Sequence, residues 1–365
     1  MDYSQRLSRL RARMQSTQTD MVVLGPSSHM VWLSGLSPHG DERPVMLVVT
    51  PGFAGLLMPA LNADSSRAVT DLPFYTWDDA EGPNAALARL LDDADARRKG
   101  LRLALDETMR ADFALLMLDA LPNAESRDFT EPTIGSLRAQ KDEAEFKLLK
   151  GSALLNDDAM RAAFAACKPG VTELDIVKVI TDFYEAHGAS PEFNLVCFGE
   201  NGAFPHHHSG GRVLKPNDTI LLDIGCRLNG YPSDMTRVGS IGRPDPEFEK
   251  VWAIVKDANE AAVAVARPGI PASTVDRTAR DLITKAGYGD YFLHRLGHGL
   301  GIDVHEPPYI TGTSERLLEE GNVFSVEPGV YLNGRFGVRV EDIVILRQDH
   351  AEVLSELPRD IFRCG

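Results

Sequence analysis

The chain has 365 residues, 43% of them hydrophobic and 25% charged, which is the composition of a folded globular protein with more than one domain. Its net charge of −15 and pI near 5.1 argue against a nucleic-acid or membrane-surface partner, because both require a positive field. The four cysteines stand far apart and form no CxxC pair, so we expect reduced thiols in a cytoplasmic protein.

Residues 1–132 alternate helix-like and strand-like segments. The amphipathic start, residues 1–20, lacks the basic and apolar regions of a signal peptide, and no apolar run approaches the roughly 20 residues that span a bilayer. The pattern predicts strands at residues 21–24, 45–49 and 101–105 and a helix at 85–96. These elements predict an α/β domain. It contains no recognisable cluster of catalytic residue types, so we interpret it as a scaffold or interface domain.

A domain boundary is expected near Glu131-Pro132-Thr133, where proline interrupts the pattern. A long helix follows from about Lys141 to Cys167. It should end at Lys168-Pro169-Gly170, because proline cannot continue the hydrogen-bond ladder of a helix. We therefore place a second domain at residues 133–365.

The second domain contains an internal repeat. Each copy has a proline-glycine segment between two helix-like stretches, followed by a strand that ends in an acidic residue. The first copy comprises residues 167–171 and 214–225, and the second comprises residues 266–270 and 318–329. Two blocks in the same order predict a duplicated α/β unit, with two similar halves related by an approximate two-fold axis and a site between them.

The first copy predicts a β-hairpin that carries two carboxylates. Asn229-Gly230 is a strong two-residue turn signal between strands at residues 218–225 and 231–240. This turn places Asp223 opposite Thr236 and puts Asp234 on the same face, roughly 7–8 Å away along the diagonal. Two such carboxylates could share a metal ion. The alternative is a structural, hydrogen-bonded aspartate, with Arg237 as the ion-pair partner of Asp234.

The second copy repeats the arrangement with Glu327 and Glu341. A two-residue turn at Asn333-Gly334 would put these glutamates on opposite faces of the sheet, whereas a three-residue turn or one bulge would bring them opposite each other. We therefore expect an irregularity between Gly329 and Val338.

Between the two hairpins, residues 292–307 carry His294, His298 and His305 among glycines that permit close backbone approach. Four carboxylates and one imidazole form an oxygen-rich set that suits Mn²⁺ or Co²⁺, with Zn²⁺ as an alternative. Four neighbouring negative charges require about two divalent ions, and such a pair can activate water and polarise a carbonyl.

These residues resemble the family of Xaa-Pro dipeptidases (prolidases) and aminopeptidase P, related to methionine aminopeptidase and creatinase. The matching motifs are L-D-I-G followed by G-Y-P-S-D-M-T-R, H-R-L-G-H-G-L-G-I-D-V-H-E-P, S-V-E-P-G-V-Y and G-V-R-V-E-D. The resemblance implies a creatinase-like N-terminal α/β domain and a C-terminal catalytic domain with the pseudo-two-fold "pita-bread" fold, an α/β plus α+β chain overall.

The resemblance also implies roles for individual residues. The five metal ligands would be Asp223, Asp234, His298, Glu327 and Glu341. Asp234 and Glu341 would bridge the ions, Asp223 would complete one ion, and His298 with Glu327 would complete the other. Glu327 would also carry a proton. His206 and His305 would contact the substrate and the tetrahedral intermediate, His294 would bind the substrate in the same pocket, and Arg339 would be the catalytic arginine of the site. His207 and His208, which follow His206, could be ordinary loop residues.

The implied activity is hydrolysis of the N-terminal Xaa-Pro bond of dipeptides or short peptides by a cytoplasmic homodimer. Two alternatives keep the fold: a hydrolase of a small non-peptide amide, as in ectoine hydrolases, and a non-catalytic binding module. The binding module is disfavoured because all five ligand positions are filled. Tyr309 stands where several prolidases carry an arginine that grips the substrate carboxylate, which leaves room for longer substrates or a relaxed proline preference.

Overall fold

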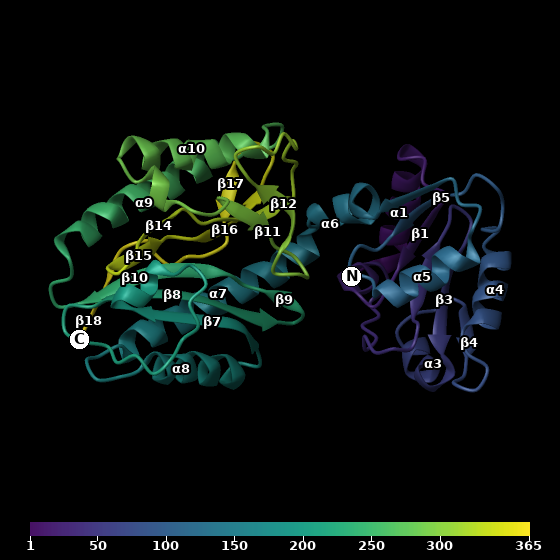
Figure 1. The fold of residues 1–365 in the computed structure, drawn as a ribbon, viewed down its shortest axis with the longest axis horizontal. Coiled ribbons are helices and arrows are strands. Elements are labelled where there is room, and N and C mark those ends of the chain that lie inside the picture. Colours follow the sequence, from purple (N-terminus) through teal and green to yellow (C-terminus); the bar gives the residue numbers. More distant parts are fainter. The chain divides into compact units, whose positions relative to one another are not determined.

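The computed structural model describes residues 1–365, which form two compact units, Met1–Arg138 and Ala139–Gly365 (Figure 1). The residues at the expected boundary, Glu131-Pro132-Thr133, lie within the first unit. Pro132 stands in the first turn of a short helical segment, η1 (Glu131–Gly135), where its missing N–H costs no hydrogen bond. Helix α6 (Ser136–Ala139) follows, and its Arg138 donates a hydrogen bond to His29 Nδ1 at 3.1 Å.

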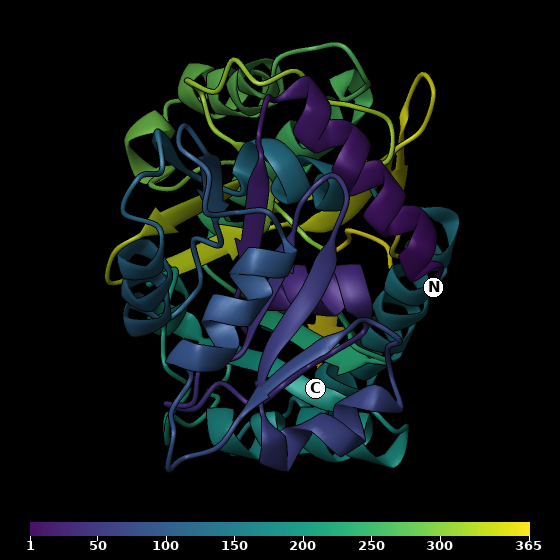
Figure 2. The same cartoon turned by 90° about the vertical axis from the view of Figure 1, so that its right-hand side faces the viewer.

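The first unit, coloured purple to blue in Figure 2, is built on a mixed sheet. The sheet has six strands in the order β4-β3-β2-β1-β5-β6. Its strands are β1 (Met21–Leu24), β2 (Met46–Val49), β3 (Ala54–Pro59), β4 (Phe74–Trp77), β5 (Arg102–Leu105) and β6 (Ser126–Phe129). Its helices are α1 (Tyr3–Ser16), α2 (Ser28–Ser34), α3 (Ala60–Arg67), α4 (Asn84–Asp93) and α5 (Ala111–Ala120). The α/β class expected for this part of the chain is confirmed, and the expected strands correspond to β1, β2 and β5.

The second unit contains four long helices and three sheets. Its helices are α7 (Glu143–Ala166), α8 (Glu173–Ala186), α9 (Pro246–Val265) and α10 (Ala272–Lys285). Strands β7 (Ser190–Phe198), β8 (Thr219–Leu228), β9 (Tyr231–Pro232), β10 (Met235–Ile241) and β18 (Phe362–Cys364) form the first sheet. Strands β11 (Gly297–Gly299), β12 (Glu306–Ile310), β13 (Val323–Val326), β16 (Asp342–Leu346) and β17 (Ala351–Val353) form the second, and β14 (Gly329–Leu332) pairs with β15 (Phe336–Arg339).

Within this unit the strands lie between α8 on one side and α9 with α10 on the other (Figure 1). Two apolar cores follow from this layering. One joins α7 and α8 to β7, β8 and β10, and the other joins α9 and α10 to the strands of the second half. The helices begin where local sequence dictates. Asp142 caps α7 by accepting a hydrogen bond from the Glu145 N–H at 2.9 Å, and the Glu145 carboxylate accepts one from the Asp142 N–H at 3.2 Å.

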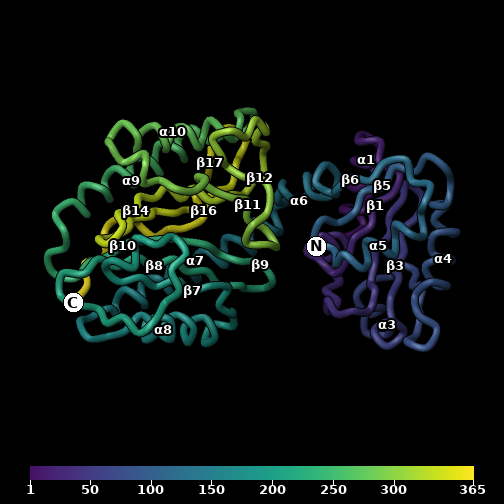
Figure 3. The backbone as a smooth tube through the Cα atoms, viewed as in Figure 1, coloured from purple at the N-terminus to yellow at the C-terminus, as the bar shows by residue number.

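The expected duplication is confirmed by matching contacts in the two halves. After α7, the Gly170 N–H donates to the Leu214 carbonyl at 3.0 Å, and after α9 the Gly269 N–H donates to the Leu318 carbonyl at 2.8 Å. Both glycines have a positive φ, 100° and 86°, which a side chain would disfavour. The backbone trace shows the same succession twice, two helices and then a β-hairpin (Figure 3). None of the helices is both long and apolar enough to cross a membrane.

A buried ion pair connects the two halves of the second unit. Arg237 on β10 and Asp342 on β16 are each 1% exposed, and Arg237 Nη2 lies 2.8 Å from Asp342 Oδ1. Arg237 Nη1 also donates to the Glu341 carbonyl at 2.6 Å. The alternative in which Arg237 pairs with Asp234 is therefore wrong, because the guanidinium is directed to the strand of the other half.

Replacing Arg237 with methionine should lower the free energy of unfolding by about 3 kcal/mol, because a buried carboxylate and several carbonyls lose their donor. Urea unfolding would measure the loss. Arg161→Met is the matched control, since Arg161 forms an exposed pair with Asp158 on α7 and should contribute under about 0.5 kcal/mol. Equal stabilities for the two variants would contradict this role.

Candidate functional site

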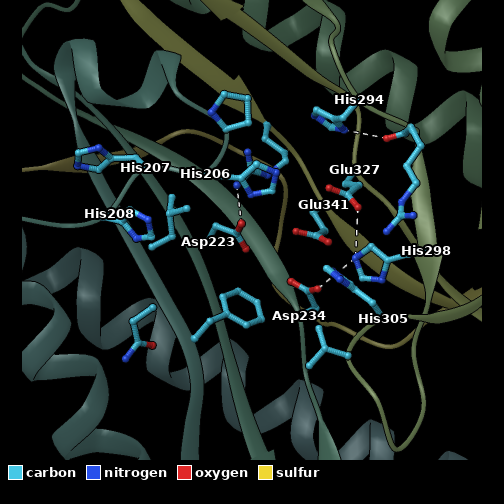
Figure 4. Close-up of a pocket in the computed structure, with 17 residues that line it drawn as sticks. His206, His207, His208, Asp223, Asp234, His294, His298, His305, Glu327 and Glu341 are labelled. Atoms are coloured by element: carbon cyan, nitrogen blue, oxygen red, sulfur yellow. Dashed lines mark hydrogen bonds and ion pairs between the residues drawn. The ribbon is translucent and has the colours of Figure 1, made fainter. Parts of the chain in front are cut away.

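A cavity of about 690 Å³ in the second unit collects the chemically reactive side chains (Figure 4). All nine residues that the sequence singled out line it: His206, Asp223, Asp234, His294, His298, His305, Glu327, Arg339 and Glu341. They come from both hairpins, from the glycine-rich loop between them, and from the segment after β7. The predicted gathering of these side chains is therefore present in the fold.

The first hairpin has the predicted register. Asp223 on β8 lies opposite Thr236 on β10, and Leu228 lies opposite Tyr231. The turn residues Asn229 and Gly230 have φ of 51° and 84°, as a two-residue turn of this type requires. The return strand is interrupted between β9 and β10, and Asp234 stands in that interruption with its carboxylate toward the cavity (Figure 4).

The second hairpin has the predicted irregularity, a three-residue turn formed by Asn333, Gly334 and Arg335. Leu332 pairs with Phe336 and Gly329 with Arg339, while beyond the break Val326 pairs with Asp342. Glu327 and Glu341 occupy the matching gaps between these paired strands, so the same register places them opposite each other. Both carboxylates are directed into the cavity (Figure 4).

His298 lies on β11, which packs between β12 and β13. A Cβ at the preceding residue, Gly297, would overlap the Ser325 carbonyl oxygen, so glycine is required for this close approach. The His298 Nδ1 lies 3.2 Å from the Gly299 carbonyl, which assigns the ring proton to Nδ1. The unprotonated Nε2 then lies 3.3 Å from Glu327 Oε1 and 3.5 Å from Asp234 Oδ2.

Burial and mutual repulsion make these charges costly. Burial, followed by the charges of neighbouring carboxylates, raises the pKa of Asp234 and of Glu341 well above the ordinary range. Burial raises the pKa of Glu327 to about 7 and lowers that of His298 to about 3. At neutral pH the neutral imidazole therefore presents a lone pair to two acidic groups, an arrangement that a cation or bound protons must satisfy.

The donor set fits divalent cations. One atom each from Asp234, His298 and Glu341 lies within 4.8 Å of the other two. Asp223 Oδ1 is buried and has no hydrogen-bond partner, although its other oxygen accepts from Arg339 Nη2 at 2.5 Å. A set of oxygen ligands with one imidazole suits hard or intermediate divalent ions. A bound ion would also explain why a buried carboxylate oxygen of Asp223 has no hydrogen-bond donor.

Two residues without an assigned role support this arrangement. Thr236 donates from Oγ1 to Glu341 Oε2 at 2.7 Å, and the Tyr331 hydroxyl lies 2.8 Å both from Arg339 Nη1 and from His294 Nε2. The Arg339 guanidinium donates hydrogen bonds to Asp223, Thr236 and Tyr331. Arg339 thus orients a carboxylate. Thr236 could have been found from sequence through its predicted pairing with Asp223. Tyr331 could have been found as the aromatic residue of the S-V-E-P-G-V-Y motif.

The three consecutive histidines divide into different environments. His207 Nε2 lies 3.0 Å from Oε2 of Glu173, a buried glutamate at the start of α8. The same Glu173 oxygen accepts from the Gly210 N–H at 2.9 Å, so this contact holds the loop. His206 and His208 are exposed to the cavity instead. His305 is also exposed, and its ring centroid lies 4.0 Å from that of His298.

A second acidic cluster lies in the first unit, where His29, Asp106 and Glu107 stand close together. Arg138 donates to His29 Nδ1 at 3.1 Å, so this nitrogen is an acceptor already in use. Asp106 accepts from Ser27 Oγ at 2.5 Å and from Thr108 Oγ1 at 2.6 Å. Protein donors therefore already contact these atoms of His29 and Asp106, whereas Asp223 Oδ1 in the cavity has no such donor.

Comparison with known proteins gives a family for each unit. Residues 147–348 match metallopeptidase family M24, and residues 6–140 match the creatinase/prolidase N-terminal domain. The chain is 31% identical to the Xaa-Pro dipeptidase of Lactobacillus helveticus over 360 residues, which covers 97% of this chain and 98% of that protein.

Two solved structures have the same fold. The prolidase from Thermococcus sibiricus matches with a TM-score of 0.91 and 35% identity, covering 100% of this chain and 99% of that one. Dipeptidase PepE from Mycobacterium ulcerans matches with a TM-score of 0.93 and 31% identity, again covering 100% and 99%. The expected fold, a creatinase-type N-terminal domain and a pita-bread domain, is confirmed. The chain belongs to metallopeptidase family M24.

Proposed function

We propose that this chain is an exopeptidase that hydrolyses the N-terminal Xaa-Pro bond of dipeptides or short peptides with two divalent metal ions. The proposal is supported by its resemblance to the L. helveticus protein named Xaa-Pro dipeptidase and to the T. sibiricus prolidase. The observation that carries it is the convergence of four carboxylates and a neutral imidazole in one cavity, where burial and mutual repulsion disfavour the charged carboxylates unless cations are bound.

We assign the ions to five ligands. Asp223, Asp234, His298, Glu327 and Glu341 would hold the pair. Mn²⁺ and Co²⁺ suit this set, with Zn²⁺ as an alternative. When bound, such a pair supplies an activated water and polarises the scissile carbonyl.

The remaining groups of the cavity would handle the substrate and its protons. Glu327 would take a proton from the attacking water and pass it to the proline nitrogen as the carbon–nitrogen bond breaks. His206 and His305 would donate hydrogen bonds to the carbonyl oxygen as its negative charge develops. His294, whose pKa burial lowers to about 4, is neutral and lines the cavity beside them. Arg339 would act by positioning Asp223.

The carboxylate crowding predicts a distinctive pH dependence in protein stripped of metal by a chelator. The pKa of Glu327 is raised to about 7, so its contribution to stability is present below an unfolded value near 4.5 and is lost as the pH rises through 7. A shift of this size costs on the order of 3 kcal/mol. Chelated Glu327→Gln should therefore be more stable than chelated wild type at pH 8.5 and similar at pH 4.5.

Urea unfolding of both proteins at the two pH values, with a chelator present, would measure this difference. His294 and His298 remain in both proteins, so their own titration cancels in the comparison. Parallel pH profiles for wild type and Glu327→Gln would show that Glu327 is not under electrostatic strain.

A substrate panel tests the proposed activity. Chelated protein would be supplied with Mn²⁺, Co²⁺ or Zn²⁺ and offered Ala-Pro, Gly-Pro-Xaa tripeptides and a cyclic amidine. Release of the N-terminal residue from the proline peptides is expected. Activity confined to the cyclic amidine would favour the small-amide alternative, and inactivity with every metal would favour a binding module. The expected homodimer, which rests on the family resemblance, would elute at twice the chain mass in gel filtration.

A further inference from the structure

One arginine in the cavity has no partner of opposite charge. Arg295 lines the cavity and is partly buried, and no carboxylate of the chain forms an ion pair with it. By contrast Arg339, the other arginine of the cavity, contacts Asp223. In a chain with a net charge of −15, an unpaired guanidinium beside the reactive groups is poised to bind an anion.

The guanidinium of Arg295 is held in place by an aromatic ring. Its Cζ lies 4.5 Å from the ring centroid of Tyr309, close enough for a cation–π contact. Tyr309 lies on β12 directly opposite His298 on β11, so the ring that carries the arginine is anchored to the strand next to the site. A cation–π contact uses none of the guanidinium N–H donors, and two parallel N–H groups of an arginine match the two oxygens of a carboxylate.

The positive charge of Arg295 influences two reactive groups of the cavity, His305 and Glu327. After burial, Arg295 is the main cause that lowers the pKa of His305, and it also lowers the pKa of Glu327. An anion bound by Arg295 would thus lie near the histidine that faces the substrate. Arg295 also follows His294, whose Nδ1 donates to the Arg295 carbonyl at 2.7 Å, which fixes the backbone from which the side chain extends.

We infer that Arg295 binds the free α-carboxylate of a dipeptide substrate and selects dipeptides over longer peptides. This inference rests on the proposed peptidase function. It also gives Tyr309 a role: the tyrosine supports a guanidinium supplied by the segment that precedes β11. In a tripeptide the carboxylate is one residue farther from the scissile bond, and the contact with Arg295 is lost.

The test compares Ala-Pro with Ala-Pro-amide, which has the same shape but no carboxylate. For Arg295→Met, kcat/KM on Ala-Pro should fall by about 10²-fold, mainly through KM, while kcat/KM on the amide should change by less than about 3-fold. Arg295→Lys should restore part of the preference for the acid. Tyr309→Leu should lower the acid-to-amide ratio by about 3-fold, because the guanidinium is less ordered.

Metal content and thermal stability would be measured for each variant, and Arg161→Met on the exposed face of α7 serves as the matched control. An equal loss on acid and amide in Arg295→Met, or an unchanged acid-to-amide ratio in Tyr309→Leu, would overturn the inference while leaving the peptidase activity standing. Failure of wild type to cleave either substrate would overturn the proposed function, and the inference with it.

Discussion

Glu341→Gln is expected to lose bound metal and to lower kcat/KM on Ala-Pro by at least about 10³-fold, because it removes one of the carboxylates proposed to hold the ions. Glu341 is buried and close to Asp234 and His298. Asp234→Asn should have the same effect. Atomic emission measurement of metal per chain, alongside hydrolysis rates, would test both variants.

The same substitution should stabilise the metal-free protein, because the pKa of Glu341 is raised by burial and by the neighbouring carboxylates. The variant would then lose activity while the free energy of unfolding of its metal-free form increases. A folding defect cannot produce this combination. Glu352→Gln on β17 is the control, since Glu352 pairs with Arg347 away from the cavity. Full metal content in Glu341→Gln would remove Glu341 from the ligand set.

The second large effect is expected at His305. His305→Ala should lower kcat by about 10²- to 10³-fold, as for loss of one donor to a developing oxyanion, with bound metal unchanged. His305 is exposed to the cavity, and burial together with Arg295 lowers its pKa, so it is a neutral donor at pH 7. His350→Ala, at an exposed position outside the cavity, is the control.

Metal content distinguishes the two roles that His305 could have. If His305→Ala retains both ions but turns over slowly, the histidine acts on the substrate. Loss of metal in this variant would reassign His305 as a ligand, since its ring packs against that of the proposed ligand His298.

The hairpins were predictable from sequence because strand register depends on local rules. The Asn229-Gly230 turn fixed the pairing of Asp223 with Thr236, and side-chain alternation put Asp234 on the same face. Alternation also required one extra residue before Glu341, which the structure supplies as Arg335 in a three-residue turn. These inferences need only the period of a strand and the chemistry of a turn.

Contacts between distant segments were not predictable in this way. Asn259 on α9 donates from Nδ2 to the Val326 carbonyl at 2.8 Å, immediately before Glu327, but nothing in the α9 sequence indicates that partner. Glu173 similarly orders the histidine loop from the start of another helix. The Arg237 alternative failed for the same reason, since its partner Asp342 comes from the other half of the fold. Such pairs depend on packing that no local period encodes.

We propose that five side chains from the two hairpins and the intervening loop bind two divalent ions. Isothermal titration of chelated wild-type protein with Mn²⁺ tests it directly. Two ions per chain are predicted for wild type. Fewer are predicted for Asp223→Asn, because in the wild-type chain Asp223 Oδ1 is buried without a protein partner and is placed to bind an ion. A wild-type chain that binds no Mn²⁺ here, and no Co²⁺ or Zn²⁺ in parallel titrations, would contradict this ligand assignment.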